Sequence, residues 1–226
     1  MSALQGGRMS LLARFIRPSV LLGLIFATTS FAFSQDLLDG VEQRYGTDAR
    51  ARVVAWQKLM VNIAESNEGD LTNIKRANDF FNRVKWISDQ EHWGIEDYWA
   101  TPIETLATNA GDCEDFSVGK YFTLQNTHFD IDKIRITYVK ALDLNQAHMV
   151  LAYYATPDAE PLILDNINKS ILPASERKDL MPIYSFNGDS LWLARSGTRK
   201  IPINVKKTLP HWSELNERIM KELSKN

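Results

Sequence analysis

The apolar residues of this chain change their spacing near residue 130, and that change limits the possible folds more than any other feature. Residues 36–45, 49–65 and 70–86 repeat apolar side chains every three or four positions, as amphipathic helices do. From Lys133 onward the repeat falls to two, and β-branched residues become frequent. We therefore expect an α+β domain in which helices precede and pack on an antiparallel sheet.

Strand patterns follow one another closely in the second half of the chain. Three strands are expected: 133–139, 147–154 and 161–166. The second and third are separated by a short turn, so they can form a hairpin. In that hairpin His148, near the start of one strand, lies beside Asp165, at the end of the other.

The chain has one cysteine, Cys113. A single thiol cannot form an internal disulfide, and a structural zinc site needs several soft ligands. The remaining chemical use is as a nucleophile, which requires a base and a group that orients the base. His148 and Asp165 suit these two roles. A second interpretation, that Cys113 is only a small buried hydrophobic residue, stays open.

A helix is expected from Cys113 to about Leu124, with Asp112 as its N-cap and Asp115 completing a capping arrangement. A thiol in the first turn of a helix feels the positive end of the helix dipole, which favours the thiolate. The aromatic segment 92–102 leads into this region and is expected to be a loop that is either packed or used in function. A closing amphipathic helix is expected at 211–223.

Acidic side chains surround the cysteine, and their charge opposes ionisation of the thiol unless a cation offsets it. Asp112, Glu114 and Asp115 place three carboxylates within four residues, and carboxylate oxygens are preferred ligands of calcium. The spacing is not that of an EF-hand. From the residues alone, a calcium site and simple helix capping with surface charge both remain open.

Residues 1–34 have the pattern of a secretory signal peptide. Three arginines precede an apolar stretch that runs from Val20 to Phe33, and Ala32 and Ser34 are small residues at the positions a signal peptidase reads. We predict cleavage after Ser34, which leaves 35–226 as the mature domain. An uncleaved membrane anchor is the alternative, and in both cases the domain is exported. Because an oxidising compartment disfavours idle cysteines, export strengthens the case for a functional thiol.

The charge of the predicted mature domain is mildly acidic. Removing residues 1–34 leaves 23 basic residues against 28 acidic ones, a net charge of −5. Binding to phosphate backbones needs a concentrated basic surface, so we expect no nucleic-acid partner.

Three segments of the sequence resemble the bacterial transglutaminase-like cysteine proteinases: Gly111–Phe116, Ala147–Val150 and Leu162–Asn166. The resemblance covers essentially the whole mature chain. It implies a papain-like or transglutaminase-like core and a catalytic triad of Cys113, His148 and Asp165.

The same resemblance implies a periplasmic, calcium-dependent endopeptidase, with Asp112, Glu114 and Asp115 as calcium ligands. Its expected substrate is the N-terminal region of a large RTX-type surface adhesin, cut at an Ala-Ala site so that the cell leaves a biofilm. Its expected partner is an inner-membrane receptor for cyclic di-GMP whose periplasmic domain sequesters the protease.

Two other function classes remain open on the residues. A transglutaminase or an amidase uses the same triad with a different acyl acceptor, and the fold does not distinguish them. A non-enzymatic exported binding module would bury Cys113 in its core and use Trp93, Tyr98 and Trp99 as a partner surface.

Overall fold

The computed structural model describes residues 32–188, 190–193, 201–202 and 204–223. Of the predicted signal peptide, residues 1–31 lie outside the described residues, so the peptide and its cleavage after Ser34 stay predictions. Ser34 itself is the N-cap of the first helix, where its side chain accepts a hydrogen bond from Leu37 N. Among the described residues, no helix combines the length and the apolar content that a bilayer span requires.

Helices occupy most of the N-terminal half of the described chain, and one more closes it. They are α1 (Gln35–Tyr45), α2 (Thr47–Glu65), α3 (Asp70–Phe81), α4 (Asp89–His92), α5 (Pro102–Thr108), α6 (Cys113–Gln125), α7 (Val205–Thr208) and α8 (Pro210–Leu223). Short 3-10 turns lie at Ile131–Lys133 and Ala174–Glu176. The helices expected at 36–45, 49–65 and 211–223 are confirmed.

Strands make up most of the C-terminal half. They are β1 (Lys85–Trp86), β2 (Ala110–Gly111), β3 (Ile134–Ala141), β4 (Gln146–Tyr153), β5 (Leu162–Leu164), β6 (Leu172–Pro173), β7 (Leu180–Asn187), β8 (Ser190–Leu193) and β9 (Ile201–Pro202). Within the described residues β3 to β9 form one antiparallel sheet in the order β6-β5-β4-β3-β7-β8-β9. This arrangement confirms the predicted α+β class and the predicted β4–β5 hairpin.

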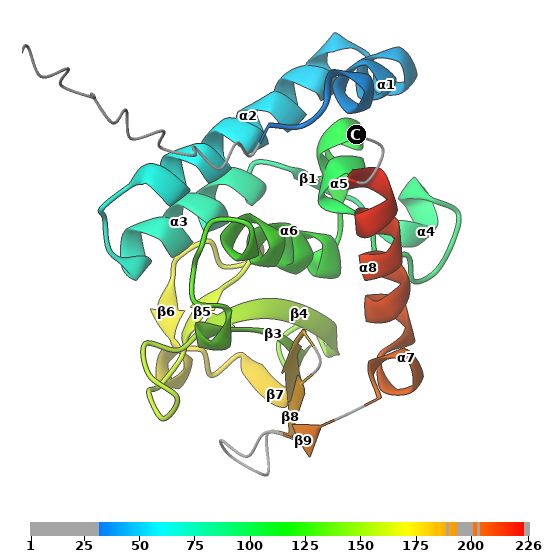
Figure 1. Ribbon diagram of the computed structural model, residues 1–226. Helices are drawn as coiled ribbons and strands as arrows, with labels where there is room; N and C mark the ends of the chain where they lie inside the picture. The colour runs from blue at the N-terminus through cyan, green and yellow to red at the C-terminus, as the bar shows by residue number, and fades with distance from the viewer. Residues whose placement is uncertain (1–31, 189, 194–200, 203, 224–226) are drawn as a thin grey trace, which may run out of the picture. The chain divides into compact units, whose positions relative to one another are not determined.

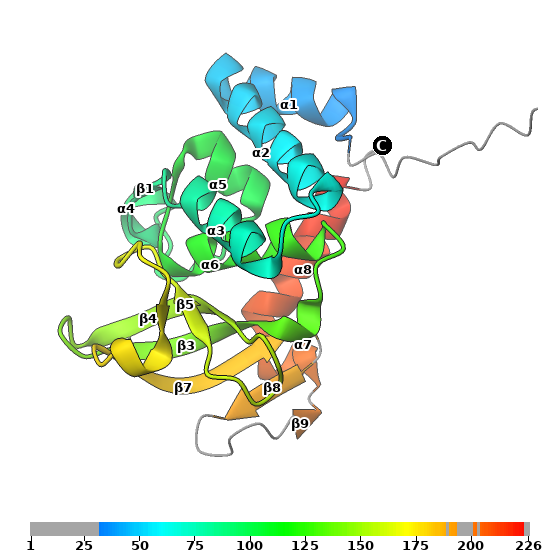
Figure 2. The ribbon, with the colours of Figure 1, turned by 90° about the vertical axis from the view of Figure 1, so that its left-hand side faces the viewer.

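Helix α6 lies between α2 and α3 on one side and the sheet on the other (Figures 1 and 2). On one side Trp56 of α2 donates a hydrogen bond from Nε1 to Thr123 Oγ1, 2.8 Å away. Gly119 allows α3 to approach closely, since a Cβ built there would lie 2.1 Å from a ring carbon of Phe81. On the other side α6 packs on Met149 and Leu151 of β4. The cysteine at its first position is therefore held by both layers.

The predicted helix over 70–86 is wrong at its end. Helix α3 stops at Phe81, and Asn82 leaves helical geometry as its C-cap. Lys85 and Trp86 then pair in parallel with Ala110 and Gly111. This pairing joins residues far apart in sequence, so it overrides the helical spacing of a local window. Its effect is to fix the backbone immediately before Cys113.

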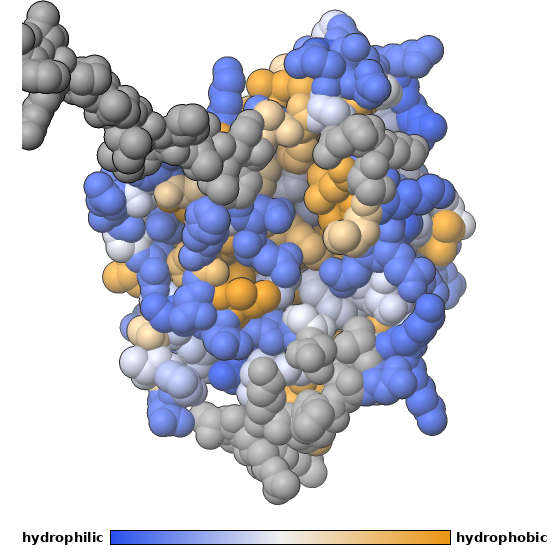
Figure 3. All heavy atoms as spheres, viewed as in Figure 1, coloured by the Kyte–Doolittle hydropathy of each residue, from blue (hydrophilic) through white to orange (hydrophobic). Residues whose placement is uncertain are grey.

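The two faces of the sheet are covered differently. Side chains such as Ile136, Met149 and Leu151 face α6 and belong to the main core, whereas Val139, Val150, Ala152 and Ile163 form a separate cluster on the opposite face, here called the outer face. Figure 2 shows the helices on one side of β3, β4 and β7. In Figure 3 hydrophilic residues cover most of the face shown, with hydrophobic ones visible near α1 and α2 and in the middle.

Candidate active site

Cys113 is the first residue of α6, as predicted, and the turn before it is tightly built. The backbone N–H of Asp112 donates to Asp115 Oδ2 at 3.2 Å, which is one half of a capping box. Gly111 makes this possible, because a Cβ at that position would lie 2.6 Å from the same carboxylate oxygen. The thiol thus sits at the positive end of a well-capped helix.

Asp115 anchors this turn from inside the protein. Its side chain is fully buried and also accepts a 2.7 Å hydrogen bond from the backbone N–H of Ala100. Burial, reinforced by the nearby charge of Asp112, raises the pKa of Asp115 well above its usual value. The aromatic segment is therefore tied directly to the cysteine turn.

The C-terminal part of the aromatic segment is packed, whereas residues 94–97 are exposed. Trp99 is buried and stacks on Phe186 of the sheet. The guanidinium of Arg218, on α8, lies 4.5 Å above the Tyr98 ring and donates to Glu104 Oε2 at 2.9 Å. Helix α8 thereby holds the segment that precedes the cysteine.

The thiol of Cys113 is half-buried and donates to Glu114 Oε2 at 2.9 Å. Its sulfur also lies against the backbone N–H of Met149, the residue after His148. Within the described residues no hydrogen bond joins the thiol to the His148 ring. Burial, followed by the charge of Glu114, raises the pKa of Cys113 well above its usual value, a shift opposite in direction to the one expected from the helix dipole.

His148 and Asp165 are brought together as predicted. His148 Nε2 lies 2.8 Å from Asp165 Oδ1, and both side chains are buried. They are diagonal rather than opposite neighbours, because the ladder pairs Leu151 with Leu164 and so aligns Asp165 with Val150. The two side chains share the outer face of the sheet.

Asp165 has further partners that sequence reasoning missed. Arg177 Nη2 donates to Asp165 Oδ2 at 2.6 Å, and the backbone N–H of Ile167 donates to Oδ1 at 3.0 Å. Burial alone would raise the pKa of Asp165, but the bonds from His148, Ile167 and Arg177 outweigh it and lower that pKa. Asp165 is therefore ionised, and its Oδ1 accepts a hydrogen bond from the protonated Nε2 of His148.

A buried polar cluster lies behind Asp165. Asn82 Nδ2 donates to the backbone carbonyl of Asp165 at 2.8 Å, and Lys169 Nζ donates to the carbonyl of Asn82 at 3.0 Å. Lys120, on α6, is fully buried, and its Nζ has no hydrogen-bond partner among the described residues. Burial lowers the pKa of Lys120 to about 7. The segment after β5 is thus fixed to α3.

Five acidic side chains meet at the start of α6. Their carboxylate oxygens fall into groups within 4.8 Å of one another: Asp89 with Asp112 and Asp115, Asp89 with Asp97 and Glu114, and Asp112 with Glu114 and the sulfur of Cys113. The three predicted ligands are all present. Asp89 and Asp97 were not predicted, because they come from an earlier segment that only the fold brings to this point.

These residues fit a divalent cation that prefers oxygen ligands. One carboxylate oxygen of Asp89 and one of Asp112 are buried and lack a hydrogen-bond partner in the described part of the chain. Burial and neighbouring carboxylates raise the pKa of Asp89 to about 6 and that of Asp112 to about 8. Both effects mark a site where negative charge is crowded and uncompensated.

Comparison with known proteins agrees with this arrangement. A family model described as bacterial transglutaminase-like cysteine proteinase matches residues 46–184. A solved structure of EGTA-treated LapG from Legionella pneumophila is 40% identical, with a TM-score of 0.71 over 81% of this chain and 96% of that one. Calcium-bound LapG from the same organism is 39% identical, with a TM-score of 0.68 over 81% and 98%. A comparison with curated proteins finds no match.

Proposed function

The chain belongs to the bacterial transglutaminase-like cysteine proteinases, and from that premise we propose that it is a calcium-dependent periplasmic endopeptidase with a Cys113, His148, Asp165 triad. Its proposed substrate is the N-terminal region of a large RTX-type surface adhesin, which it cuts at an Ala-Ala site to promote biofilm dispersal. Membership of a cysteine proteinase family favours this over a non-enzymatic binding module.

The bond between His148 and Asp165 carries the proposal. Since Asp165 is ionised, it accepts from Nε2–H of His148, which leaves Nδ1 unprotonated. An imidazole with an unprotonated Nδ1 is the form that general-base activation of a thiol requires. Arg177 and Ile167 N–H then keep Asp165 in place.

The reaction proceeds through an acyl-enzyme. His148 Nδ1 takes the thiol proton of Cys113 while the sulfur attacks the peptide carbonyl carbon. The C–N bond then breaks, and the amine leaves with the proton from His148. Water, deprotonated by His148, attacks the thioester carbonyl, the C–S bond breaks, and His148 returns the proton to the sulfur as the acid is released. The backbone N–H of Cys113 at the start of α6 is a suitable donor to the oxyanion.

Asp112, Glu114 and Asp89 are the residues best suited to hold calcium, with Asp115 and Asp97 beside them. When bound, calcium supplies positive charge that offsets the acids around the thiol. Glu114 links such a site to the thiol, because its carboxylate accepts the hydrogen bond from Cys113 Sγ. The calcium-bound structure of LapG from Legionella pneumophila supports the requirement.

The periplasmic location, the adhesin and the regulatory partner rest on the family resemblance. We propose the periplasmic domain of an inner-membrane cyclic di-GMP receptor as the partner that sequesters the enzyme. Capture of the mature domain by such a receptor domain, lost when cyclic di-GMP is removed, is the expected result. Equal capture with and without the nucleotide would contradict this part of the proposal.

The central experiment is cleavage of an adhesin N-terminal fragment by the mature domain, followed by mass spectrometry. We expect one cut at Ala-Ala with calcium, no cut with EGTA, and no cut by Cys113→Ala. A fragment in which Ala-Ala is replaced by Glu-Glu is the matched substrate control. Cleavage by Cys113→Ala would overturn the mechanism. An added primary amine that appears in the product in place of water would identify an acyl transferase instead.

A further inference from the structure

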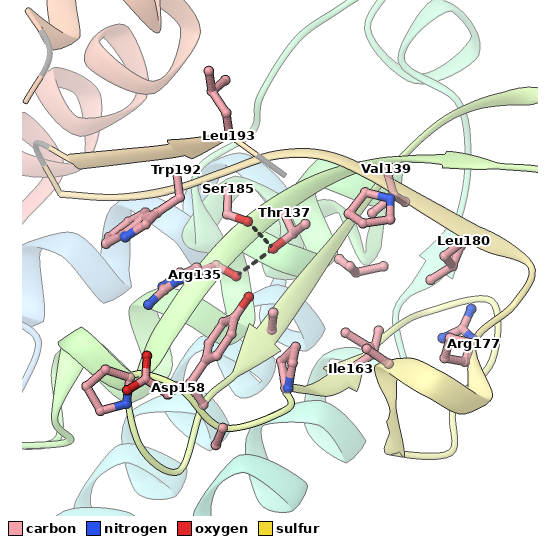
Figure 4. Close-up of a pocket in the computed structure, with 18 residues that line it drawn as sticks. Arg135, Thr137, Val139, Asp158, Ile163, Arg177, Leu180, Ser185, Trp192 and Leu193 are labelled. Carbon is pink, nitrogen blue, oxygen red and sulfur yellow. Dashed lines mark hydrogen bonds between the residues drawn. The ribbon is translucent and has the colours of Figure 1, made fainter. Parts of the chain in front are cut away.

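A cavity of about 350 Å³ lies on the outer face of the sheet (Figure 4). Val139 of β3, Val150 and Ala152 of β4 and Ile163 of β5 line its apolar part. A volume of this size suits a small molecule. Cys113 does not line it, and neither does any residue of the acidic cluster.

Arg135 lines this cavity as a buried cation. Its side chain is 6% exposed and lies between two aromatic rings, with its guanidinium carbon 4.1 Å from the centre of Tyr154 and 4.2 Å from that of Trp192. Its Nε is buried without an acceptor, and in the described part of the chain no carboxylate forms an ion pair with it. Burying a charge is costly unless it is paired, and ring contacts offset only part of that cost.

Hydroxyl groups lie beside this cation. Thr137 Oγ1 is 3.1 Å from Ser185 Oγ, and Figure 4 shows both between Trp192 and Val139. Thr137 has one hydroxyl hydrogen and two acceptors, Ser185 Oγ and the backbone carbonyl of Arg135 at 3.4 Å. When it donates to Ser185, the shorter contact, Ser185 keeps its own hydrogen for another acceptor. The cavity therefore presents a positive charge and a hydroxyl donor at one end and aliphatic side chains along the rest.

The end of the cavity away from Arg135 lies next to a residue of the candidate active site. Arg177 lines that end and is 3% exposed, and its Nη1 is buried without a partner among the described residues. The same guanidinium donates to Asp165. The cavity and the His148–Asp165 pair thus share one arginine, although they are separate sites.

We propose that this outer-face cavity binds a small amphipathic carboxylate, such as a medium-chain fatty acid. The carboxylate pairs with Arg135 and accepts from Ser185, and the alkyl chain lies over Val150, Ala152 and Ile163 toward Arg177. Charge complementarity selects this ligand class, since the cavity offers an anion a cation that has a tyrosine hydroxyl but no carboxylate partner among the described residues, and offers its tail an apolar floor. The exposed Asp158 at the rim disfavours a second negative group there.

Titration calorimetry with decanoate tests the proposal, using uncharged decanamide as the matched probe. We expect decanoate to bind one site on the mature domain and to bind about tenfold more tightly than decanamide. Arg135→Met keeps an unbranched side chain between the rings and removes the charge, so it should erase that preference. Arg83→Met, at an exposed arginine between α3 and β1, is the control and should leave binding unchanged.

A second variant guards against loss of the fold in Arg135→Met. Ala152→Phe fills the cavity from its floor and should abolish binding of both probes while circular dichroism and the unfolding midpoint stay close to wild type. The proposal is overturned if wild type binds neither probe, if it binds both equally, or if Ala152→Phe binds decanoate as wild type does. None of these readouts depends on protease activity, so the ligand-binding proposal and the proposed function can fail independently of each other.

Discussion

The sulfur of Cys113 lies 2.9 Å from Oε2 of Glu114, so the carboxylate of the next residue in sequence accepts the hydrogen of the thiol. This contact keeps the thiol protonated, because both burial and the adjacent charge oppose a thiolate. For the thiol to ionise readily, the Glu114 carboxylate must be drawn away from the sulfur or its charge must be offset.

Glu114→Gln should make the thiol more reactive when calcium is absent. The amide removes the negative charge that raises the pKa of Cys113, so more thiolate is present at neutral pH. The rate of alkylation by iodoacetamide in EGTA should rise several-fold over wild type. Glu176→Gln, at an exposed glutamate, is the control. An unchanged rate in Glu114→Gln would show that burial alone sets the reactivity.

Asp165→Asn should reduce kcat by about a thousandfold or more, since an asparagine can hold the imidazole in the wrong tautomer. Asp179→Asn removes a different partner of Arg177 and leaves the His148–Asp165 bond in place. It should cost about tenfold at most. Steady-state cleavage rates of folded variants decide the matter, and similar losses in the two variants would argue against an orienting role for Asp165.

Without calcium, stability should fall between pH 5 and pH 8. The folded-state pKa values of Asp89 and Asp112 are raised to about 6 and about 8, so the folded state binds more protons than the unfolded state in this window. The stability is full below the unfolded value of 3.8 and is lost as pH rises through the folded values. After allowance for partial exposure, we expect the free energy of unfolding, measured with urea in EGTA, to fall by about 2 kcal/mol.

Calcium should abolish most of that pH dependence, because it compensates the ionised carboxylates. In EGTA, the unfolding free energy of Asp112→Asn should also change less with pH, but for a different reason: the variant has one fewer group to titrate. A slope in EGTA that is flat, or that rises with pH, would mean that these acids are not held in the crowded state described here.

Gly119→Ala should destabilise the protein by about 1 to 3 kcal/mol, because its Cβ would overlap the Phe81 ring where α3 packs on α6. Gly40→Ala is the matched control in α1, where nothing lies within 4 Å of the new Cβ. That change should stabilise by about 0.5 to 1 kcal/mol. Urea unfolding of both variants provides the comparison, and equal effects would contradict the close packing.

Lys120→Met should stabilise the protein at pH 6 by an amount on the order of 3 kcal/mol, and by much less at pH 10. Burial lowers the pKa of Lys120 from 10.5 to about 7, so the unfolded state binds its proton more tightly and stability rises with pH between these values. Methionine carries no proton and removes this penalty. Unfolding free energies at the two pH values test it, and a gain that does not depend on pH would assign the effect to packing.

Local patterns in the sequence predicted local structure well. Of the predicted core-facing stripe in 49–65, Val53, Trp56, Met60 and Ile63 are buried, whereas Val54 and Leu59 are only partly buried. The capping arrangement of Asp112 and Asp115 is present. Failures occurred where distant segments pair. Lys85 and Trp86 continue a helical spacing, yet they form a strand because Ala110 and Gly111 lie beside them.

The same distinction applies to the site. The short β4–β5 hairpin made the proximity of His148 and Asp165 predictable. Asp89 and Arg177 were not predictable, because neither lies in a motif. Asp89 reaches the cysteine through the β1–β2 pairing, and Arg177 reaches Asp165 from the turn that follows β6. Strands β7 and β8 also went unpredicted, since their place in the sheet depends on pairing with β3.

A contact from helix α8, near the C-terminal end of the described chain, holds the segment that precedes the cysteine turn. Arg218 donates to the backbone carbonyl of Trp99, a partner 119 positions earlier in the chain. Because chains are made from the N-terminus, the segment that positions the cysteine turn cannot contact Arg218 until almost the whole domain has been synthesised. A nascent or truncated chain can therefore carry all three residues of the proposed triad and still lack the contact that holds the cysteine turn.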